Sequence, residues 1–260
     1  MVDTLALWRP SWPAPERVQA CMTFRTGGVS CGPWSQLNLA SHVGDLPEHV
    51  AENRARLSQT LQVVPVYLEQ VHGTAVIELG RAGELSADAS LTCQPRQACT
   101  VMVADCLPVL LCDVHGRWVS AAHAGWRGLA GQAGTGVLET VVLALQAKGV
   151  RPQDLLAWLG PCIGPLEFEV GPEVVQALSA VPTQDESCFR VGRSSRHFLA
   201  DLAQLARNRL HRLGVQAVFG NDSTESWCTV RQSSLFFSHR RDARILGSTG
   251  RMAALVWLND

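Results

Sequence analysis

Three successive stretches in the middle of the chain are apolar at nearly every position. They are CTVMVAD at 99–105, PVLLCDV at 108–114 and WVSAAHA at 118–124. A strand with one face in water alternates apolar and polar residues, whereas these stretches place apolar side chains on both faces. Each predicted strand must therefore be covered on both sides, by helices or by a second sheet. This requirement favours a layered fold.

The flanking segments supply the other layers. Apolar residues at helical spacing predict helices at 45–62, 129–148 and 198–214. Asp45 is a candidate N-cap for the first of these helices. Short or alternating apolar runs predict strands at 18–25, 63–70, 74–79, 155–160, 215–220, 234–239 and 252–258. Because helices and strands do not alternate regularly, we expect an α+β fold. The predicted architecture is a layered α/β/β/α sandwich with mixed sheets.

The chain is long enough for one large domain. Of its 260 residues, 47% are hydrophobic and 17% are charged, which is ample for a sizeable buried core. No internal repeat or long linker divides the sequence. We therefore expect a single domain over residues 1–260, in which the prolines of residues 1–17 indicate an extended N-terminal arm.

Charge and cysteine content limit the partners and the compartment. A net charge of -1 gives no bulk attraction to nucleic acid or to an anionic membrane. The longest apolar runs are interrupted by charges and are too short to span a bilayer. Nine cysteines without a C-x-x-C pair are typical of reduced, mostly buried thiols. Residues 1–18 lack the pattern of a signal peptide. We expect a cytoplasmic protein that acts on a small molecule.

Three residues of metal-ligand type occur at the edges of predicted buried strands. They are His72 in QVHG, Cys106 in ADCLP and His123 in AHAGWRG. They are too far apart in the sequence for a compact zinc finger, so the fold must gather them. Two imidazoles and one thiolate suit Zn²⁺ and leave its fourth tetrahedral position open to water or substrate. The same set would also bind Cu²⁺.

Two other interpretations use the same residues. Without a metal, Cys106 would be a nucleophile with His123 or His72 as its base, and Asp105 would orient the imidazole. Alternatively, the metal is structural in a non-catalytic binding module, with Cys228 or Asp105 as a fourth ligand.

Arginines beside glycine-rich turns indicate anion binding, because glycine lets the backbone approach a ligand and the arginine guanidinium forms two parallel hydrogen bonds to phosphate. The candidates are Arg25 in RTGGVS, Arg54 in ENRARL, Arg127 in GWRG and the pair Arg240–Arg241 in SHRRD. Asn38 in LNLA is a candidate buried amide that orients substrate. The Gly- and Pro-rich segment 160–173 is expected to be a rigid loop that forms a pocket wall.

These fragments form an ordered set along nearly the whole chain. It comprises FRTGGVS, LNLASHVGD, ENRARL, EQVHG, ADA at 87–89, VADCLPVLL, AAHAGWRG, GPCIGPLEFEVG, CTVR, FFSHRRD and STGRMAAL. The set resembles the YfiH-type family, once described as multicopper polyphenol oxidoreductases or laccases. His239 departs from the pattern, because the family commonly has tyrosine at this position.

The resemblance implies a layered α+β fold with one zinc ion held by His72, Cys106 and His123. It also implies phosphorolysis of adenosine, inosine, guanosine and methylthioadenosine, and hydrolytic deamination of adenosine. The older implication is copper-dependent oxidation of phenols, and a further one is a hydrolase that edits peptidoglycan precursors. Multicopper oxidation needs several copper centres, whereas the sequence offers one convincing three-ligand set. Among the activities that the resemblance implies, we therefore expect that of a zinc enzyme whose substrates are a purine nucleoside and phosphate.

Overall fold

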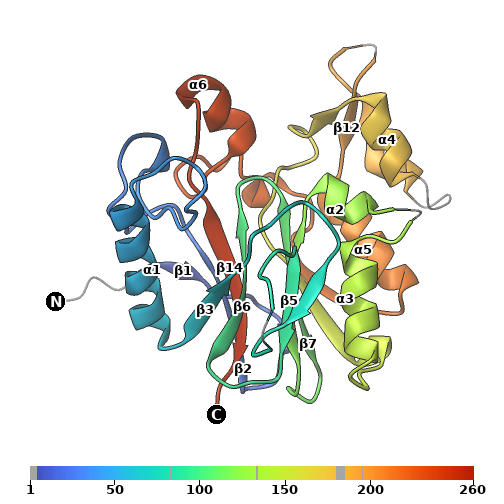
Figure 1. Cartoon of the computed structure of the whole chain (residues 1–260). Helices are drawn as coiled ribbons and strands as arrows, with labels where there is room; N and C mark the ends of the chain where they lie inside the picture. The colour runs from blue at the N-terminus through green and yellow to red at the C-terminus, as the bar shows by residue number, and fades with distance from the viewer. Residues whose placement is uncertain (1–4, 82, 133, 180–184, 195) are drawn as a thin grey trace.

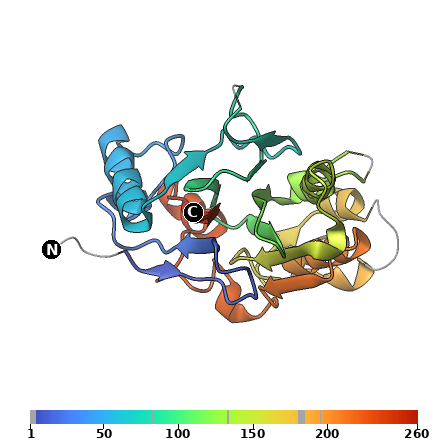
Figure 2. The same cartoon turned by 90° about the horizontal axis from the view of Figure 1, so that it is seen from below.

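Two mixed β-sheets pack face to face, and helices cover the outer face of each sheet (Figures 1 and 2). The computed structural model describes residues 5–81, 83–132, 134–179, 185–194 and 196–260. This arrangement confirms the predicted layered α+β fold with mixed sheets.

The first sheet has five strands in the order β1-β2-β14-β6-β3. Neighbouring strands are antiparallel except for β3 and β6, which are parallel. The bounds are Leu7–Trp8 for β1, Val18–Thr23 for β2, Met252–Leu258 for β14, Gln97–Val103 for β6 and Val64–Tyr67 for β3. Helix α1, Pro47–Leu61, covers the outer face of this sheet, where Leu57 joins Cys21 and Leu255 in one buried cluster.

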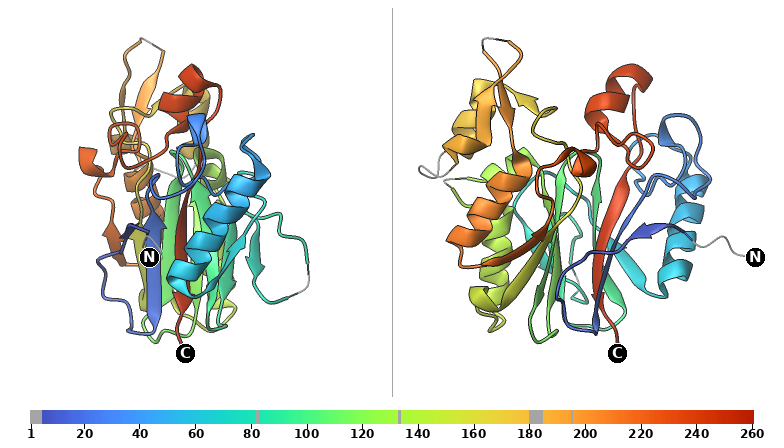
Figure 3. Two further views of the ribbon diagram at one scale, coloured as in Figure 1. Left: turned by 90° about the vertical axis from the view of Figure 1, so that its left-hand side faces the viewer. Right: turned by 180° about the vertical axis from the view of Figure 1, so that it is seen from behind.

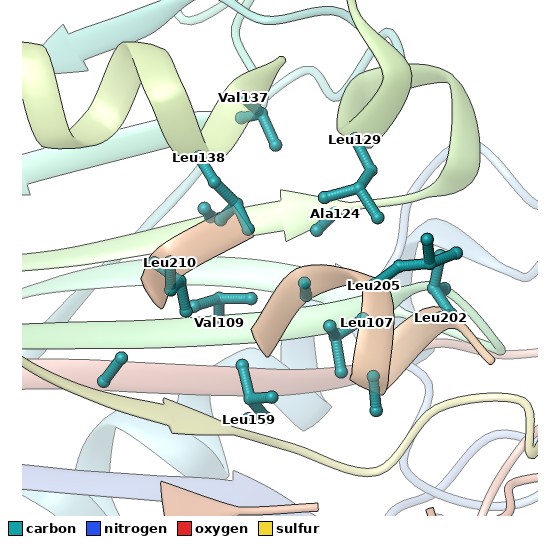
Figure 4. Close-up of a cluster of buried hydrophobic side chains, with 14 of the residues drawn as sticks. Leu107, Val109, Ala124, Leu129, Val137, Leu138, Leu159, Leu202, Leu205 and Leu210 are labelled. Carbon is teal, nitrogen blue, oxygen red and sulfur yellow. The ribbon is translucent and has the colours of Figure 1, made fainter. Parts of the chain in front are cut away.

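The second sheet has six strands in the order β13-β9-β7-β8-β5-β4. The outer pairs β13–β9 and β4–β5 are parallel, and the central pairs are antiparallel. The bounds are Ala217–Gly220 for β13, Leu155–Leu159 for β9, Leu107–Asp113 for β7, Val119–Ala124 for β8, Ala89–Thr92 for β5 and Val76–Glu78 for β4. Helices α3, Val137–Gln146, and α5, Leu202–Arg212, pack buried leucines such as Leu138 and Leu210 on its outer face (Figure 4).

The two faces of strand β7 explain the continuous apolar runs of the sequence. Val109 and Leu111 pack against the helices, whereas Leu110 and Cys112 pack against the first sheet. All seven residues of β7 are buried. Alternate side chains of one strand thus enter two different cores, which is why every position of the strand is buried and nearly all are apolar.

The predicted helix at 129–148 is in fact two helices, α2 at Trp126–Ala130 and α3. Gly131 has a φ of 61°, and a Cβ at Gly131 or Gly136 would collide with nearby backbone. Helix α3 begins afresh after Gly136, whose N–H donates to Glu139 Oε2. The prediction was wrong for the described residues between Gly131 and Gly136, because the spacing of apolar residues gives no sign of such close backbone contacts; residue 133 lies outside the described residues.

Two further predicted elements differ from the structure. The helix expected at 198–214 begins only at Leu202, because Asp201 caps it by accepting the N–H of Gln204 at 2.9 Å. The strand expected at 234–239 is absent: the described segment consists of turns that lead into a π-helix at His239–Ala243. Phe236 and Phe237 are fully buried there without joining a sheet.

A small antiparallel sheet and two short helices stand above the ends of the main sheets (Figures 1 and 3). The sheet contains β10 at Glu169–Val170, β12 at Phe198–Ala200 and β11 at Phe189–Val191, and the helices are α4 at Pro172–Leu178 and α6 at Arg244–Leu246. Short 3-10 turns occur at Gly32–Trp34, Pro152–Asp154, Glu186–Cys188 and Glu225–Trp227.

The expected N-terminal arm contains strand β1, whose Leu7 pairs with Thr23 of β2. Trp8 stacks on Trp227 with ring centroids 4.7 Å apart. Residues 1–4 of this arm lie outside the described residues. Across the described part of the chain, no helix is both long and apolar enough to cross a membrane.

Candidate metal centre and substrate cavity

The structure brings His72, Cys106 and His123 together. His72 lies in the turn after β3, Cys106 directly precedes β7, and His123 lies near the end of β8. Their ligand atoms all lie within 4.8 Å of one another. Cys106 Sγ is 4.0 Å from His72 Nε2, and the two imidazole rings meet edge to face. Three chain segments therefore converge on one candidate metal centre.

The buried carboxylate of Asp88 orients both histidines. It accepts the His123 Nδ1–H at 2.8 Å and the backbone N–H groups of His72 and Gly73 at 2.9 and 2.6 Å. Because Nδ1 of His123 is engaged, Nε2 is the nitrogen left for a metal. The same carboxylate holds the turn in which His72 has a φ of 59°. Asp88 therefore fixes the geometry of two candidate ligands.

Asp105 does not orient an imidazole, so that prediction was wrong. Its carboxylate accepts the hydroxyl of Thr229 and the backbone N–H of Arg240, each at 2.6 Å. Cys228 Sγ likewise accepts the N–H of Gly164 at 3.2 Å. Among the described residues, the cluster of metal-ligand type contains only the three predicted side chains.

The cluster carries a charge-separated pair. Burial raises the pKa of the Cys106 thiol, but the charge of His123 and hydrogen bonds from both histidines outweigh it and lower the pKa to about 6. Burial lowers the pKa of His123, but Cys106 and Asp88 outweigh it and raise the pKa to about 9. Without a metal, Cys106 is therefore a thiolate at neutral pH, which is the form that binds metals and reacts with electrophiles.

This pKa predicts how the thiol reacts in chelator-treated protein. Because Cys106 loses its proton near pH 6, its alkylation by iodoacetamide should rise between pH 5 and 7 and level off above that. An ordinary thiol would keep gaining reactivity up to about pH 9. Peptide mapping by mass spectrometry follows Cys106 separately from the exposed Cys31 and Cys93. A midpoint near 8.5 would contradict the charge-separated pair.

Small residues around His123 let the segments approach closely. A Cβ on Gly125 would lie 2.9 Å from Cys106 Sγ and 3.2 Å from His72 Cδ2. A Cβ on Gly128 would lie 2.9 Å from the carbonyl oxygen of Gly73. The two distances of 2.9 Å are shorter than a Cβ atom tolerates, so this corner between β8 and α2 requires glycine.

The cluster lies in the wall of a cavity of about 420 Å³. Trp126 and Phe168 contribute aromatic rings, and Ile163 joins Phe168 in bearing out the expected pocket wall at 160–173. The full lining comprises His42, Gln70, His72, Met102, Val103, Ala104, Asp105, Cys106, His123, Trp126, Arg127, Ile163, Phe168, Leu202, His239, Arg240 and Arg251.

Of the candidate anion-binding residues, Arg127 and Arg240 line this cavity. Arg25 donates to the backbone carbonyls of Ser35 and Ser233 and stacks on Phe237. Arg54 donates from Nε to the carbonyl of Leu39 and lies 3.8 Å over the ring of Tyr67. The structure therefore places both guanidinium groups against protein, away from the cavity lining.

Asn38 also lies outside the cavity, in a fully buried network. Its Nδ2 donates to the carbonyl of Ala40 and to the Asp45 carboxylate, and its Oδ1 accepts the N–H of Arg251 at 3.0 Å. The prediction that Asp45 is the N-cap of α1 was wrong: Leu46 occupies that position, and the Asp45 carboxylate accepts a hydrogen bond from Asn38 within this network. Asn38 thus supports the loop that carries His42 to the cavity.

The sequence prediction missed several cavity residues, of which Arg251 is the most conspicuous. Arg251 directly precedes the buried strand β14, and it stands in the STGRMAAL fragment. A charged residue at the edge of a buried strand is the same signal that identified the metal cluster. Applied to every predicted strand, it would also have identified Arg251.

Residues 19–259 match the family model described as multi-copper polyphenol oxidoreductase laccase. The chain belongs to this family. We keep the term YfiH-type family, since a relative from Escherichia coli is named purine nucleoside phosphorylase YfiH; it is 47% identical over 96% of this chain and 97% of its own length. A Pseudomonas aeruginosa relative, also named a purine nucleoside phosphorylase, is 49% identical over 96% of this chain and 98% of its own.

Solved structures of similar proteins share the fold. The chain is similar to a Neisseria meningitidis protein of the DUF152 family, with a TM-score of 0.86 and 44% identity over 98% of this chain and 99% of that one. It is also similar to YlmD from Geobacillus stearothermophilus, with a TM-score of 0.85 and 30% identity over 95% and 94%. The YfiH-type fold is thus present along essentially the full described chain.

Proposed function

We propose that this chain is a zinc-dependent purine nucleoside phosphorylase. The observation that carries the proposal is the His72–Cys106–His123 cluster in a cavity with both aromatic and basic walls. The relatives named purine nucleoside phosphorylase, at 47% and 49% identity, support it. The proposed substrates are adenosine, inosine, guanosine and methylthioadenosine, with phosphate as the second substrate.

The donor set fits a zinc ion. Cys106 is held as a thiolate, and Asp88 directs the free Nε2 of His123 to the same point as the sulfur. Two imidazoles and a thiolate are ligands that Zn²⁺ prefers, and an oriented second shell is typical of such sites. When bound, the ion would supply a Lewis acid at this end of the cavity. His72, Cys106 and His123 are the residues that would hold it.

The reaction requires an anion site and a place for the leaving purine. A phosphate oxygen bonds to C1′ of the ribose while the bond between C1′ and N9 breaks. The bonding electron pair leaves with the purine, which takes the proton that the phosphate gives up. Guanidinium groups hold and orient the phosphate, and Arg127 on α2 is one that lines the cavity.

The cavity lining suits the purine and limits attack by water. Trp126 and Phe168 offer ring faces on which a planar base can stack. Val103, Ile163 and Leu202 contribute apolar walls that reduce the water available near C1′. Since water attack would give free ribose, this exclusion favours phosphorolysis over hydrolysis.

Hydrolytic deamination of adenosine is a second candidate, because three protein ligands leave room for water at the same centre. Copper-dependent phenol oxidation is disfavoured. Multicopper oxidation needs several copper centres to pass electrons to oxygen, and the described residues form one cluster of metal-ligand type.

A product assay tests the proposal directly. Zinc-loaded protein is incubated with adenosine, with and without phosphate, and adenine, inosine, hypoxanthine and ribose 1-phosphate are separated by chromatography. We expect adenine and ribose 1-phosphate only when phosphate is present. Inosine formed without phosphate would establish the deaminase. No turnover of any nucleoside, together with phenol oxidation or cleavage of a peptidoglycan precursor, would overturn the proposal.

A further inference from the structure

Three arginines line the cavity, and they differ in what already binds them. Arg127 is exposed and stacks on the ring of Trp126, with 4.6 Å between the guanidinium carbon and the ring centroid. Arg240 is exposed, and its Nη1 donates to the carbonyls of Glu167 and Glu169. Arg251 is half-buried, which sets it apart from the other two. A partly desolvated guanidinium binds an anion more strongly than an exposed one.

The side chain of Arg251 is fixed on one side only. Its Nη1 donates to the carbonyls of Thr249 and Gly250 at 2.9 and 3.2 Å. Within the described residues, Nε and Nη2 donate to no protein group, and no carboxylate forms an ion pair with this arginine. Nε and Nη2 form the edge of a guanidinium that accommodates two oxygens of one anion in parallel.

The surroundings of Arg251 exclude a protein carboxylate as its missing partner. Among the residues that the structure describes, Asp105 is the only acidic one in the cavity lining, and its two oxygens already accept hydrogen bonds from Thr229 and from the backbone of Arg240. Burial lowers the pKa of Arg251, and the charges of Cys106 and Asp105 offset part of this effect, but within the described residues neither group forms an ion pair with it. A half-buried guanidinium without a directly paired counter-charge is unusual in proteins. In a cavity, the missing counter-charge is expected on the ligand.

The backbone of Arg251 is also unusually well anchored. Its N–H donates to Oδ1 of the buried Asn38 at 3.0 Å, and its carbonyl accepts the N–H of Leu39 at 3.3 Å. On its other side it continues directly into strand β14 in the centre of the first sheet. The free edge is therefore presented from a rigid part of the fold, as precise positioning of a reactant requires.

We propose that Arg251 is the phosphate-binding residue of this cavity and holds the dianion through two parallel hydrogen bonds from Nε and Nη2. The assignment rests on the proposed phosphorylase function. Arg127, at the exposed wall, serves to attract the anion. Arg240 is used mainly to hold the loop that carries Phe168.

Binding of inorganic phosphate tests the assignment independently of turnover. Isothermal titration of chelator-treated protein compares wild type with Arg251→Met, Arg251→Lys, Arg127→Met and Arg244→Met. Loss of a bidentate charged pair should weaken phosphate binding about 100-fold in Arg251→Met. Lysine keeps the positive charge but lacks the two parallel donors of the guanidinium, so Arg251→Lys should weaken phosphate binding about 10-fold. Arg244 is exposed on α6 and lines no part of the cavity, so Arg244→Met should match wild type.

Steady-state kinetics supply a second readout. In Arg251→Lys, the KM for phosphate should rise while the KM for adenosine stays within about twofold of wild type. Unchanged phosphate affinity in both Arg251 variants, or a larger loss in Arg127→Met, would overturn the assignment. If wild type binds phosphate through Arg251 but forms no ribose 1-phosphate, the phosphorylase proposal fails while the anion site stands.

Discussion

Replacing Cys106 with alanine is expected to lower kcat/KM for phosphorolysis of adenosine by at least about 10³-fold. The substitution removes the thiolate that lies 4.0 Å from His72 Nε2 and leaves two imidazoles to hold the metal. It also removes the negative charge that raises the pKa of His123 to about 9, so this imidazole is left with Asp88 alone. Zinc content, measured by plasma emission spectrometry, should fall from about one ion per chain to a small fraction of that.

Cys31→Ala is the matched control, because Cys31 is an exposed thiol that does not line the cavity. This variant should keep both zinc and rate. Circular dichroism verifies that Cys106→Ala still folds, which is expected since the change removes one sulfur from a partly open cavity wall. A Cys106→Ala protein with full zinc content and full rate would remove this residue from the site and leave the metal chemistry without its thiolate.

Asp88→Asn is expected to give the second large effect, a loss of zinc affinity of 10- to 100-fold. The carboxylate accepts four hydrogen bonds, from His123 Nδ1 and from the N–H groups of Val71, His72 and Gly73. An amide accepts at one oxygen only, and its NH₂ group would face N–H donors. We therefore also expect the free energy of unfolding to fall by about 3 kcal/mol. Competition with a fluorescent zinc chelator and urea unfolding measure the two losses.

The same carboxylate predicts a pH dependence. Burial raises the pKa of Asp88, but hydrogen bonds from His123, Gly73 and His72 outweigh it and hold the pKa below its ordinary value. A carboxylate with a lowered folded-state pKa stabilises the protein above about pH 4, its unfolded value, and loses that contribution as the pH falls through the folded value. The stability difference between wild type and Asp88→Asn should therefore shrink below pH 4. A constant difference down to pH 2 would contradict this origin.

Asp113→Asn separates stability from metal binding. Asp113 is also a fully buried carboxylate that accepts backbone N–H groups, those of His115, Arg117 and Trp118, but it lies outside the cavity lining. This variant should lose stability and keep the zinc affinity of wild type. If both variants lost zinc equally, the effect of Asp88 would be one of general unfolding.

The layers and the candidate metal-ligand cluster were predictable, because each produces a recognisable local pattern in the sequence. In strand β7, alternate apolar side chains enter two different cores. The sequence of these seven residues therefore already indicates that both faces of the strand are covered. Each of the three candidate ligands is a polar residue at the edge of an apolar stretch. His72 precedes Gly73, Cys106 lies two residues before Pro108, and His123 lies two residues before Gly125. Cys106 and His123 converge because β7 and β8 are paired in one sheet, and His72 joins them from the turn after β3 of the other sheet.

The remaining site residues depend on long-range packing that single-sequence patterns do not contain. Asp88 reads as one polar residue between alanines, and its role arises only when the 71–73 turn folds over it. Arg25 and Arg54 have the right chemistry for an anion, but backbone carbonyls occupy the donors of Arg25. Arg54 donates from Nε to the carbonyl of Leu39 and lies over the ring of Tyr67, outside the cavity lining. By contrast, Arg251 donates to backbone carbonyls from Nη1 only, so among the described residues its Nε and Nη2 have no protein acceptor. Residue type thus predicts anion binding, and tertiary contacts decide which guanidinium is available for it.

Metal reconstitution with product analysis tests the central claim most directly. Chelator-treated protein is titrated with Zn²⁺ or Cu²⁺ and assayed with adenosine and phosphate, with ribose 1-phosphate as the measured product. The account predicts that phosphorolysis is absent without metal, rises in proportion to bound zinc and saturates at about one ion per chain, since three ligands form one site. Full phosphorolysis by metal-free protein, or activity restored by copper alone, would contradict it.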